Sequence, residues 1–583
     1  MAAIITSKFR FHNAEQFKES FSEAAPTNYY LFIGRPSAFA SGTTGGSDSA
    51  PPTPVDNRRT EAYNWDDMLA AKKIDSTGVT HAIPRRDLDV SGATTYDMYR
   101  PNYSASNTAN SGATSLFDST FYFMTSAYRV YKVLENKSNG AWTAAEPTTT
   151  TAAPFTTGGY TIKYMFTLST TQVQNFLTPD FIPTLTTAES GNGRADGGLD
   201  VIIVGTAGLS LVGGSAWNIT ADRTVVNVPV RGDGTGALCS VTIGGTDGTA
   251  DGTITACAVT TEGSGYTHGT VLPDDIKEQH DIQHSGVLTF SSNPVFEVII
   301  GPDGGHGTNP ARELGGHFCL TDVKLAQTEA FDFSVVNDFR QIGIVRSPYS
   351  FGTSSNFTGS TARQTYAVKL ASNSGTFTID EKITQTISAQ TISSGSVSGS
   401  VITINTASAH KLATGQMVKI ENGTFAGGAT TGHQGTHHIT VTDADTFTFA
   451  VSTSRTPTGA FTVGSSPAAT YTTFTPQGIV VEWDATNKIL FYVQNVYDNQ
   501  GTDATWKQTI PFSGNSTITG AGSSATGVPD VASSATVNNT VFVAGYANPE
   551  LKPDSGDIIY IENRKPISRA SDQTEDIKLV VEF

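Results

Sequence analysis

The apolar residues of this 583-residue chain come in short runs, which glycine, proline and small polar residues interrupt along the whole length. The run YYLFIG at 29–34, for example, has the length of one buried strand and is followed by Arg35 and Pro36. The chain also contains 57 Gly and 84 Thr. Because β-branched residues suit pleated sheets and glycine suits tight turns, this pattern predicts a mainly β protein with a few short helices, of the α+β class.

The charge balance argues against several classes of protein. The formal net charge is −17, whereas nucleic acids and anionic membranes both require a basic face on their partners, so we expect neither as a partner. No stretch reaches the roughly 18 apolar residues of a membrane-spanning helix, and the N-terminus lacks the apolar core of a secretory signal. The three cysteines (Cys239, Cys257 and Cys319) cannot form a disulfide framework, which favours assembly in a reducing cytoplasm.

Two short helices are expected near the N-terminus. Residues 3–9 have a β-like pattern, and residues 13–24 then place Phe17 and Phe21 four positions apart, on one face of a helix. Residues 62–73 predict a second helix. An extended segment is expected at 81–87, a pair of strands within 119–136, and a further strand at 158–169.

The later part of the chain predicts insertions. The segments at 375–387 and 478–495 resemble neighbouring strands of one sheet, and a Ser/Gly linker at 393–400 separates them from alternating segments that could close a small β-sandwich or barrel. Loop tips tolerate such insertions because closing a longer loop costs little extra free energy. Residues 513–538 are expected to form a loop, and two strands around a basic turn end the chain.

These patterns together predict four parts. They are a core β-rich domain from 1–190 with 541–583, a Gly-rich β insertion at 191–290, a second β domain from 291–390 with 473–540, and a small β decoration domain at 391–472.

Residues that could carry chemistry are few. His433, His437 and His438 lie close together, but no Cys or Glu stands beside them, so surface histidines are favoured over a metal site at His433 and His437. The Gly-rich segment 301–316 contains no Lys, which favours a folded loop with glycines at positive φ over a phosphate site. The cysteines are expected to be buried. We therefore predict no catalytic residues, no metal, no cofactor and no enzymatic activity.

Two basic spots stand out in this acidic chain. Arg85 and Arg86 are adjacent, and Arg564 and Lys565 lie near the C-terminus. Such spots indicate either a docking patch for an acidic neighbour or internal ion pairs with Asp87 and Glu562, and the sequence favours neither.

Several segments resemble one known family. They are IITSKF at 4–9, YYLFIGRP at 29–36, AIPRRD at 82–87, NDFRQIGIVRSP at 337–348, and the last 29 residues from 555 to 583. In this order they are similar to the baseplate wedge subunit of T-even-type contractile-tailed bacteriophages, and the loop at 304–316 resembles the cyanophage-like branch of that family.

The resemblance implies a structural protein of the virion tail, assembled in the host cytoplasm. It implies a multi-domain β-rich subunit whose N- and C-terminal segments fold together, which forms a homodimer and contacts other wedge proteins, and which takes part in the baseplate rearrangement before sheath contraction. The candidate interface residues are Arg85, Arg86, Phe339, Arg340, Tyr560, Arg564 and Lys565. Phe339 and Tyr560 lie in strand patterns, which also fits a place in the core.

The inserted β domain leaves two alternatives open. It could recognise a host surface glycan, since small β domains on phage tails often face outward, or it could clamp a neighbouring virion protein, which we favour. A polysaccharide hydrolase would require two carboxylates at catalytic spacing, which the sequence does not identify.

Overall fold

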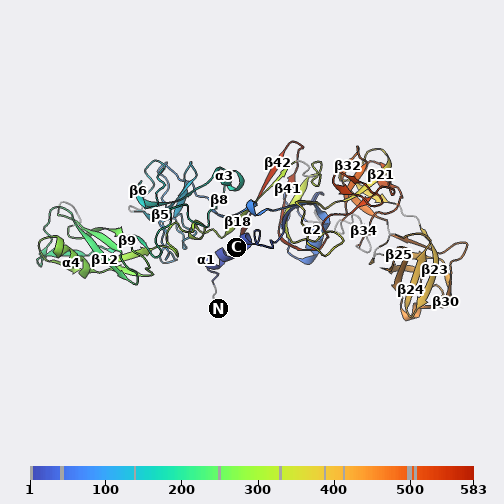
Figure 1. Ribbon diagram of the computed structural model, residues 1–583, viewed down its shortest axis with the longest axis horizontal. Coiled ribbons are helices and arrows are strands. Elements are labelled where there is room, and N and C mark those ends of the chain that lie inside the picture. The colour runs from blue at the N-terminus through green and yellow to red at the C-terminus, as the bar shows by residue number, and fades with distance from the viewer. Residues whose placement is uncertain are drawn as a thin grey trace. The chain divides into compact units, whose positions relative to one another are not determined.

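The computed structural model of the chain (Figure 1) describes residues 4–39, 45–136, 140–246, 251–326, 331–385, 389–410, 412, 414–415, 417–473, 475–494, 502–503 and 508–583. These residues contain 42 strands but only five α-helices, which confirms the predicted mainly β class. The chain forms two compact units. The first is made of Met1–Ser22, Ser76–Asp322 and Lys578–Phe583, and the second of Glu23–Asp75 and Val323–Ile577. The predicted division into four domains stays a prediction.

The first unit begins with helix α1 (Ser7–Glu19), which corrects the β-like prediction for residues 3–9. The Thr6 hydroxyl accepts a hydrogen bond from the Phe9 backbone N–H at 3.2 Å, and this N-cap starts the helix inside the segment expected to be extended. The helix predicted at 13–24 is correct only up to Glu19, so Phe17 lies in the helix and Phe21 after its end, with ring centroids 5.2 Å apart. The ring of the C-terminal Phe583 lies 5.3 Å from that of Phe17, so both chain ends fold together in this unit.

Two antiparallel sheets form the body of the first unit. One has the order β4-β5-β7-β6 and the other the order β42-β18-β3-β8, which confirms the extended segment predicted within 81–87 and the strands predicted within 119–136 and 158–169. The short helix α3 (Thr170–Phe176) connects β7 to β8, and α5 (Pro310–Leu314) precedes β18. The strands are β3 (Val79–Pro84), β4 (Tyr122–Met124), β5 (Arg129–Asn136), β6 (Phe155–Thr157), β7 (Tyr160–Thr167), β8 (Phe181–Thr184), β18 (Phe318–Ala326) and β42 (Thr574–Glu582).

A Gly-rich insertion extends from this body through a pair of strands. Strand β9 (Leu199–Thr206) pairs with β17 (Val295–Ile300), so that the chain leaves at Leu199 and returns opposite it at Ile300. The insertion also contains helix α4 (Pro273–Gln283), which the sequence analysis missed. The other strands are β10 (Leu209–Val212), β11 (Ser215–Ala216), β12 (Arg223–Gly232), β13 (Leu238–Ile243), β14 (Ile254–Thr261), β15 (Gly269–Val271) and β16 (Leu288–Ser292).

The second unit contains a five-stranded sheet of order β20-β2-β1-β19-β41. Its strands are β1 (Tyr29–Gly34), β2 (Met68–Lys73), β19 (Phe339–Arg346), β20 (Thr361–Arg363) and β41 (Asp557–Ile567). The strand predicted at 29–34 is confirmed and is buried throughout.

The helix predicted at 62–73 is correct only in its first half. Helix α2 (Arg58–Asp67) ends where β2 begins, and Met68 to Ala71 are buried. Strand β2 is hydrogen-bonded to β1 on one edge and to β20 on the other. This tertiary pairing overrides the helical pattern of the local sequence.

A seven-stranded sheet of order β33-β32-β22-β36-β37-β21-β40 forms the next layer of the second unit. The pairing of β22 (Lys382–Gln385) with β32 (Gln477–Asp484) confirms the predicted neighbours. Residues 513–538 are not simply a loop, because β36 (Ile518–Gly520) and β37 (Thr526–Pro529) lie inside this sheet. The remaining strands are β21 (Tyr366–Ser374), β33 (Ile489–Val493) and β40 (Tyr546–Ala547).

The predicted decoration domain is a barrel-like insert, as expected. Its strands form a sheet of order β27-β25-β31-β23-β24-β29-β28, and the two-stranded sheet β26-β30 packs against β23. They are β23 (Gln390–Ser398), β24 (Val401–Thr406), β25 (Met417–Glu421), β26 (Thr424–Gly428), β27 (Gly435–His438), β28 (Thr440–Val441), β29 (Thr446–Ala450), β30 (Pro457–Thr462) and β31 (Thr470–Thr473).

The Ser/Gly segment at 393–400 is a strand and not the linker that we predicted. Most of it belongs to β23, which lies between β31 and β24. A side chain at Gly395 would place its Cβ 3.1 Å from the ring of Phe461, so the glycine makes room for a core aromatic residue. The polar composition is therefore compatible with a strand because the neighbouring strands supply its packing.

Two further predictions are settled by the fold. Arg564 and Lys565 lie within strand β41, whereas we had placed them in the turn between the last two strands. Among the helices of the described ranges, none is long and apolar enough to span a membrane.

Candidate functional site

The basic pair Arg85 and Arg86 lies just after β3 and makes internal contacts. Nε of Arg85 is 3.0 Å from the Asp87 carboxylate, which is the ion pair that the sequence analysis held open. Arg86 donates hydrogen bonds to the carbonyl groups of Phe117 and Ser119, and its guanidinium lies 4.5 Å from the centre of the Tyr122 ring. Arg86 therefore holds the loop that precedes β4, while Arg85 remains partly exposed.

Phe339 and Arg340 lie at the start of β19 and are both buried. The Phe339 side chain is 1% exposed, in agreement with the alternative that places it in the core. Nε of Arg340 is 3.0 Å from both carboxylate oxygens of Asp48, and its terminal nitrogen donates to the Pro36 carbonyl. This charge-assisted contact, in which both carboxylate oxygens share one N–H group, fixes the loop that contains Asp48 against the sheet.

Tyr560, Arg564 and Lys565 are more accessible. All three belong to β41, which lies at the end of its sheet. The Tyr560 hydroxyl and the Arg564 guanidinium both bind Glu562, each at 2.9 Å. Burial and the nearby Glu562 carboxylate raise the pKa of Tyr560 to about 12. Arg564 and Lys565 are exposed, so of the seven candidate interface residues these two offer the most accessible charge.

Two of the three neighbouring histidines of the barrel are packed inside it. His433 and His437 are buried, which corrects the expectation of surface histidines. Nε2 of His433 lies 3.0 Å from the Asn422 carbonyl, and the His437 ring stacks on Phe449 with centroids 4.1 Å apart. Burial lowers the pKa of both imidazoles, so they are neutral core rings. Among the residues that the structure describes, no three metal-ligating side chains are placed to hold an ion.

The predicted folded loop covers only the first part of the Gly-rich segment 301–316, where Gly304, Gly305 and Gly307 have positive φ, whereas the second part forms α5, which ends at Gly315. It carries His306 into the core of the first unit. The strain-free glycines let the loop turn tightly around this histidine.

A buried ionic network surrounds His306. Nζ of Lys132 on β5 lies 2.8 Å from Nδ1 of His306 and 3.1 Å from the Glu313 carboxylate. The same ammonium lies 3.9 Å from the centre of the Tyr99 ring. Burial lowers the pKa of Lys132 although Glu313 raises it, and burial together with the nearby cations holds the pKa of His306 well below its usual range. Neutral His306 can thus accept a hydrogen bond from the Lys132 ammonium at Nδ1.

The network continues to the start of the Gly-rich insertion. Arg194 pairs with Asp200 at 3.0 Å and with Glu262 at 2.7 Å, and its backbone N–H donates to the His306 carbonyl at 2.9 Å. Nζ of Lys163 on β7 donates to the Asn192 carbonyl at 2.9 Å. We missed this network. The sequence signal for the network is a single lysine in each of two apolar strand runs, RVYKVLEN and YTIKYMFT. The residues that these lysines contact are far away in the sequence, so the signal does not reveal them.

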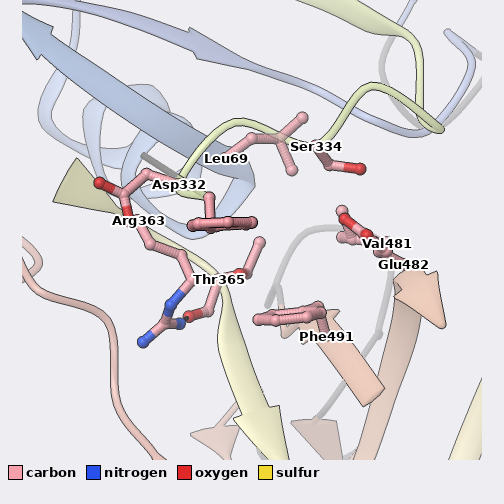
Figure 2. Close-up of a pocket in the computed structure, with 9 residues that line it drawn as sticks. Leu69, Asp332, Ser334, Arg363, Thr365, Val481, Glu482 and Phe491 are labelled. Atoms are coloured by element: carbon pink, nitrogen blue, oxygen red, sulfur yellow. Dashed lines mark hydrogen bonds between the residues drawn. The ribbon is translucent and has the colours of Figure 1, made fainter. Parts of the chain in front are cut away.

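The second unit contains a small cavity between two of its sheets (Figure 2). Its volume is about 20 Å³, and its walls are Leu69, Phe331, Asp332, Ser334, Arg363, Thr365, Val481, Glu482 and Phe491. Arg363 is buried here and donates to the Asn548 carbonyl at 2.8 Å. Since sites for organic ligands usually enclose about 300–1,000 Å³, this space has the size of a single water and not of a substrate.

Comparison with known protein families gives a match at both ends of the chain. The family described as Bacteriophage T4, Gp8 matches residues 3–153 and 529–583. No curated protein matches the chain. The matched segments contain Arg85, Arg86, Tyr560, Arg564 and Lys565, whereas Phe339 and Arg340 lie outside them. This agrees with the predicted resemblance and with a structural, non-enzymatic role. Through its N- and C-terminal segments the chain is similar to the Gp8 family, and this match identifies it as a structural protein of the phage baseplate.

Proposed function

We propose that the protein is a wedge subunit that forms a homodimer and contacts other wedge proteins during tail assembly and in the baseplate rearrangement before sheath contraction. The observation that supports this most is the match of both chain ends to the Gp8 family. A wedge subunit needs surfaces that hold its neighbours in one state and shift in another, and such surfaces need few hydrophobic residues.

The charges on β41 suit a docking role. Arg564 and Lys565 are exposed and lie in a segment that matches the family. Arg86 and Arg340 are engaged by carbonyl groups and by Asp48 within their own units, whereas Arg564 pairs with Glu562 but stays exposed. A pair of exposed basic residues on an acidic protein favours an acidic neighbour and speeds its encounter.

The first test measures the mass of the purified chain by light scattering over a dilution series. We expect a dimer, and a monomer at every concentration would contradict the proposal. The second test reverses the charge of Arg564 and Lys565 and follows wedge assembly on native gels with the other wedge proteins. The control is Lys552→Glu, another exposed lysine of the matched segment. If wedge assembly is the same for the charge-reversed variant and for the Lys552→Glu control, the proposed docking role of β41 is wrong.

Reversing Arg85 and Arg86 is a less clean test. Arg86 binds two carbonyl groups and the Tyr122 ring, so its loss disturbs the fold as well as any interface. Arg85→Glu alone is the better variant, since this side chain is partly exposed.

For the barrel we propose contact with a neighbouring virion protein. Glycan sites commonly use exposed aromatic rings, whereas the barrel's Phe425, Phe447, Phe449 and Tyr471 are buried. Deleting residues 389–475 tests this. We expect unchanged adsorption to the host and weaker incorporation of the subunit into tails, and a loss of adsorption would favour the glycan alternative.

A further inference from the structure

A groove of about 690 Å³ runs along the surface of the first unit. It is bounded by the start of α1, by the segment that leads from β3 to β4, by the Gly-rich loop and by the C-terminus. Its walls are largely apolar and include Tyr99, Pro101, Leu116, Phe117, Pro302 and Leu314. A hollow of this size and lining can bury a few apolar side chains of a partner.

Two exposed isoleucines stand at the rim of the same groove. Ile4 is 86% exposed and Ile5 is 69% exposed. They precede Thr6, which caps α1, so they lie outside the helix and leave it intact if they move. Consecutive exposed isoleucines are unfavourable in water, so burying them against a partner would be favourable.

The charges around the groove carry both signs. Lys8, Arg10 and Arg312 are its basic residues, and Asp118, Asp303 and Glu582 are its acidic ones. Lys8 already pairs with Asp303, and Arg10 with Glu582. A rim with three charges of each sign does not select a strongly acidic or basic partner. It is complementary to itself when a two-fold axis brings basic residues of one copy opposite acidic residues of the other.

Both family-matched segments contribute to this groove. Residues 4–11 and 84–118 come from the first matched segment, and Glu582 comes from the second. The groove is therefore built where the two ends that carry the family match fold together, as the contact of Phe17 with Phe583 also shows.

We propose that this groove is filled by Ile4 and Ile5 of a second copy of the chain, and that the exchange is reciprocal. The inference rests on the proposed homodimer and names the surface that forms it. Each copy contributes one pair of isoleucines and one groove, as a two-fold symmetric interface requires.

The variant Ile5→Asp tests the proposal. A carboxylate placed in an apolar groove should weaken dimerisation about 100-fold, because the charge loses its hydration without a partner. The change should leave the fold intact, since the side chain is exposed and precedes the helix. The matched control is Ile282→Asp, which replaces another isoleucine of the same unit that is also 69% exposed but lies far along the chain on α4.

Light scattering over a dilution series separates the outcomes. Supporting evidence is a dimer for the natural chain and for Ile282→Asp, together with a monomer for Ile5→Asp. A dimer that Ile5→Asp does not weaken overturns this inference but leaves the proposed dimer standing. A natural chain that is monomeric overturns both. If Ile5→Asp spares the dimer and weakens binding of another wedge protein, the occupant of the groove is that protein and not a second copy.

A cross-linking experiment tests the geometry directly. One tagged copy carries Ile5→Cys, and a second copy with a different tag carries Ser115→Cys in the groove wall. A short bismaleimide then joins the two thiols if they lie close together. We expect a covalent dimer that contains both tags, and its absence would overturn the proposal. The natural chain is the control, because Cys239 and Cys319 are buried and only Cys257 is partly accessible.

Discussion

The two inserted regions are attached to their units in the same way but are held there differently. The barrel leaves after β22 and returns at β32, where the Gln385 N–H donates to the Pro476 carbonyl at 3.1 Å. The Gly-rich insertion leaves at Leu199 and returns at Ile300, beside it on the neighbouring strand. In both cases the chain departs and comes back at adjacent residues, so the host sheet keeps its order.

Their hydrophobic cores differ. The core of the barrel is formed by residues between Ile392 and Tyr471 alone. In the Gly-rich insertion, Leu199 and Ile202 pack into the insertion, whereas Val201 and Ile299 pack into the body of the first unit. The ionic network of Lys132 and His306 adds a second attachment there. One insertion is thus a separate folding element, and the other is continuous with its host.

The largest effect is expected from Lys132→Ala. Removing the ammonium leaves Glu313 buried without its partner and deprives His306 of its donor, and breaking a buried pair in this way costs about 3–5 kcal/mol of unfolding free energy. Thermal unfolding and proteolysis should show damage on both sides of the network, in the body and in the insertion. Lys565→Ala, at an exposed lysine, should change little. A Tm equal to that of the natural chain would show that the network does not attach the insertion.

A matched pair of core truncations sharpens the difference between the insertions. Ile404→Ala in the barrel and Ile299→Ala in the stem of the other insertion remove the same atoms from buried sites, at a cost of about 2–5 kcal/mol each. We expect Ile404→Ala to expose only the barrel to proteases and Ile299→Ala to loosen both the insertion and the body. Cleavage sites mapped by mass spectrometry decide this, and the comparison fails if both variants give the same pattern.

One carboxylate joins the start of β22 to the turn between β36 and β37 in the seven-stranded sheet. Glu381 precedes β22 and accepts hydrogen bonds from the N–H groups of Thr378, Gly522 and Ser523 and from the Ser523 hydroxyl, at 2.7–3.0 Å. Glu381→Gln keeps the shape but removes the charge and one acceptor, so we expect a loss of about 1–3 kcal/mol in the stability of the second unit. Glu562→Gln, at a partly exposed carboxylate, is the control.

The pH dependence of the stability of the second unit follows from the same hydrogen bonds to Glu381. Burial alone raises the pKa of Glu381, but its hydrogen bonds to Ser523, Thr378 and Gly522 outweigh burial and lower the pKa below its ordinary value of 4.5. The carboxylate therefore contributes stability above about pH 4.5, and this contribution is lost as the pH falls through the lower, folded-state pKa. The Tm of Glu381→Gln should approach that of the natural chain in acid, and a constant gap would contradict this account.

The smallest effect on stability is expected from the largest deletion. Replacing residues 389–475 by a two-residue turn should rejoin β22 and β32 as a hairpin and change the stability of the rest by less than about 1 kcal/mol, because none of the barrel's core residues lies outside it. Circular dichroism and the Tm of the shortened chain measure this. A chain that no longer folds would show that the barrel supports its host.

Local patterns predicted the elements that are apolar in themselves. Strands β1 and β7 follow from their apolar runs, and the barrel follows from its alternation. Strands β2 and β23 were misjudged because their neighbours, and not their own residues, decide their structure.

The sequence also predicted the interaction surfaces only where their residues are close together in the chain. Arg85 and Arg564 were found as basic residues, with the ion-pair partners expected for them. The groove was not found, because its walls come from segments that are hundreds of residues apart, such as Ile5 and Leu314. A single sequence carries no signal for which distant segments meet.

The stem at Gln385 and Pro476 has a practical consequence. Since the two residues are hydrogen-bonded neighbours on one sheet, any domain whose own termini lie close together can take the place of the barrel without changing the path of the host chain. The site is therefore a natural point for recombination between related phages, and it gives an engineer a position at which to display a foreign cargo on the tail.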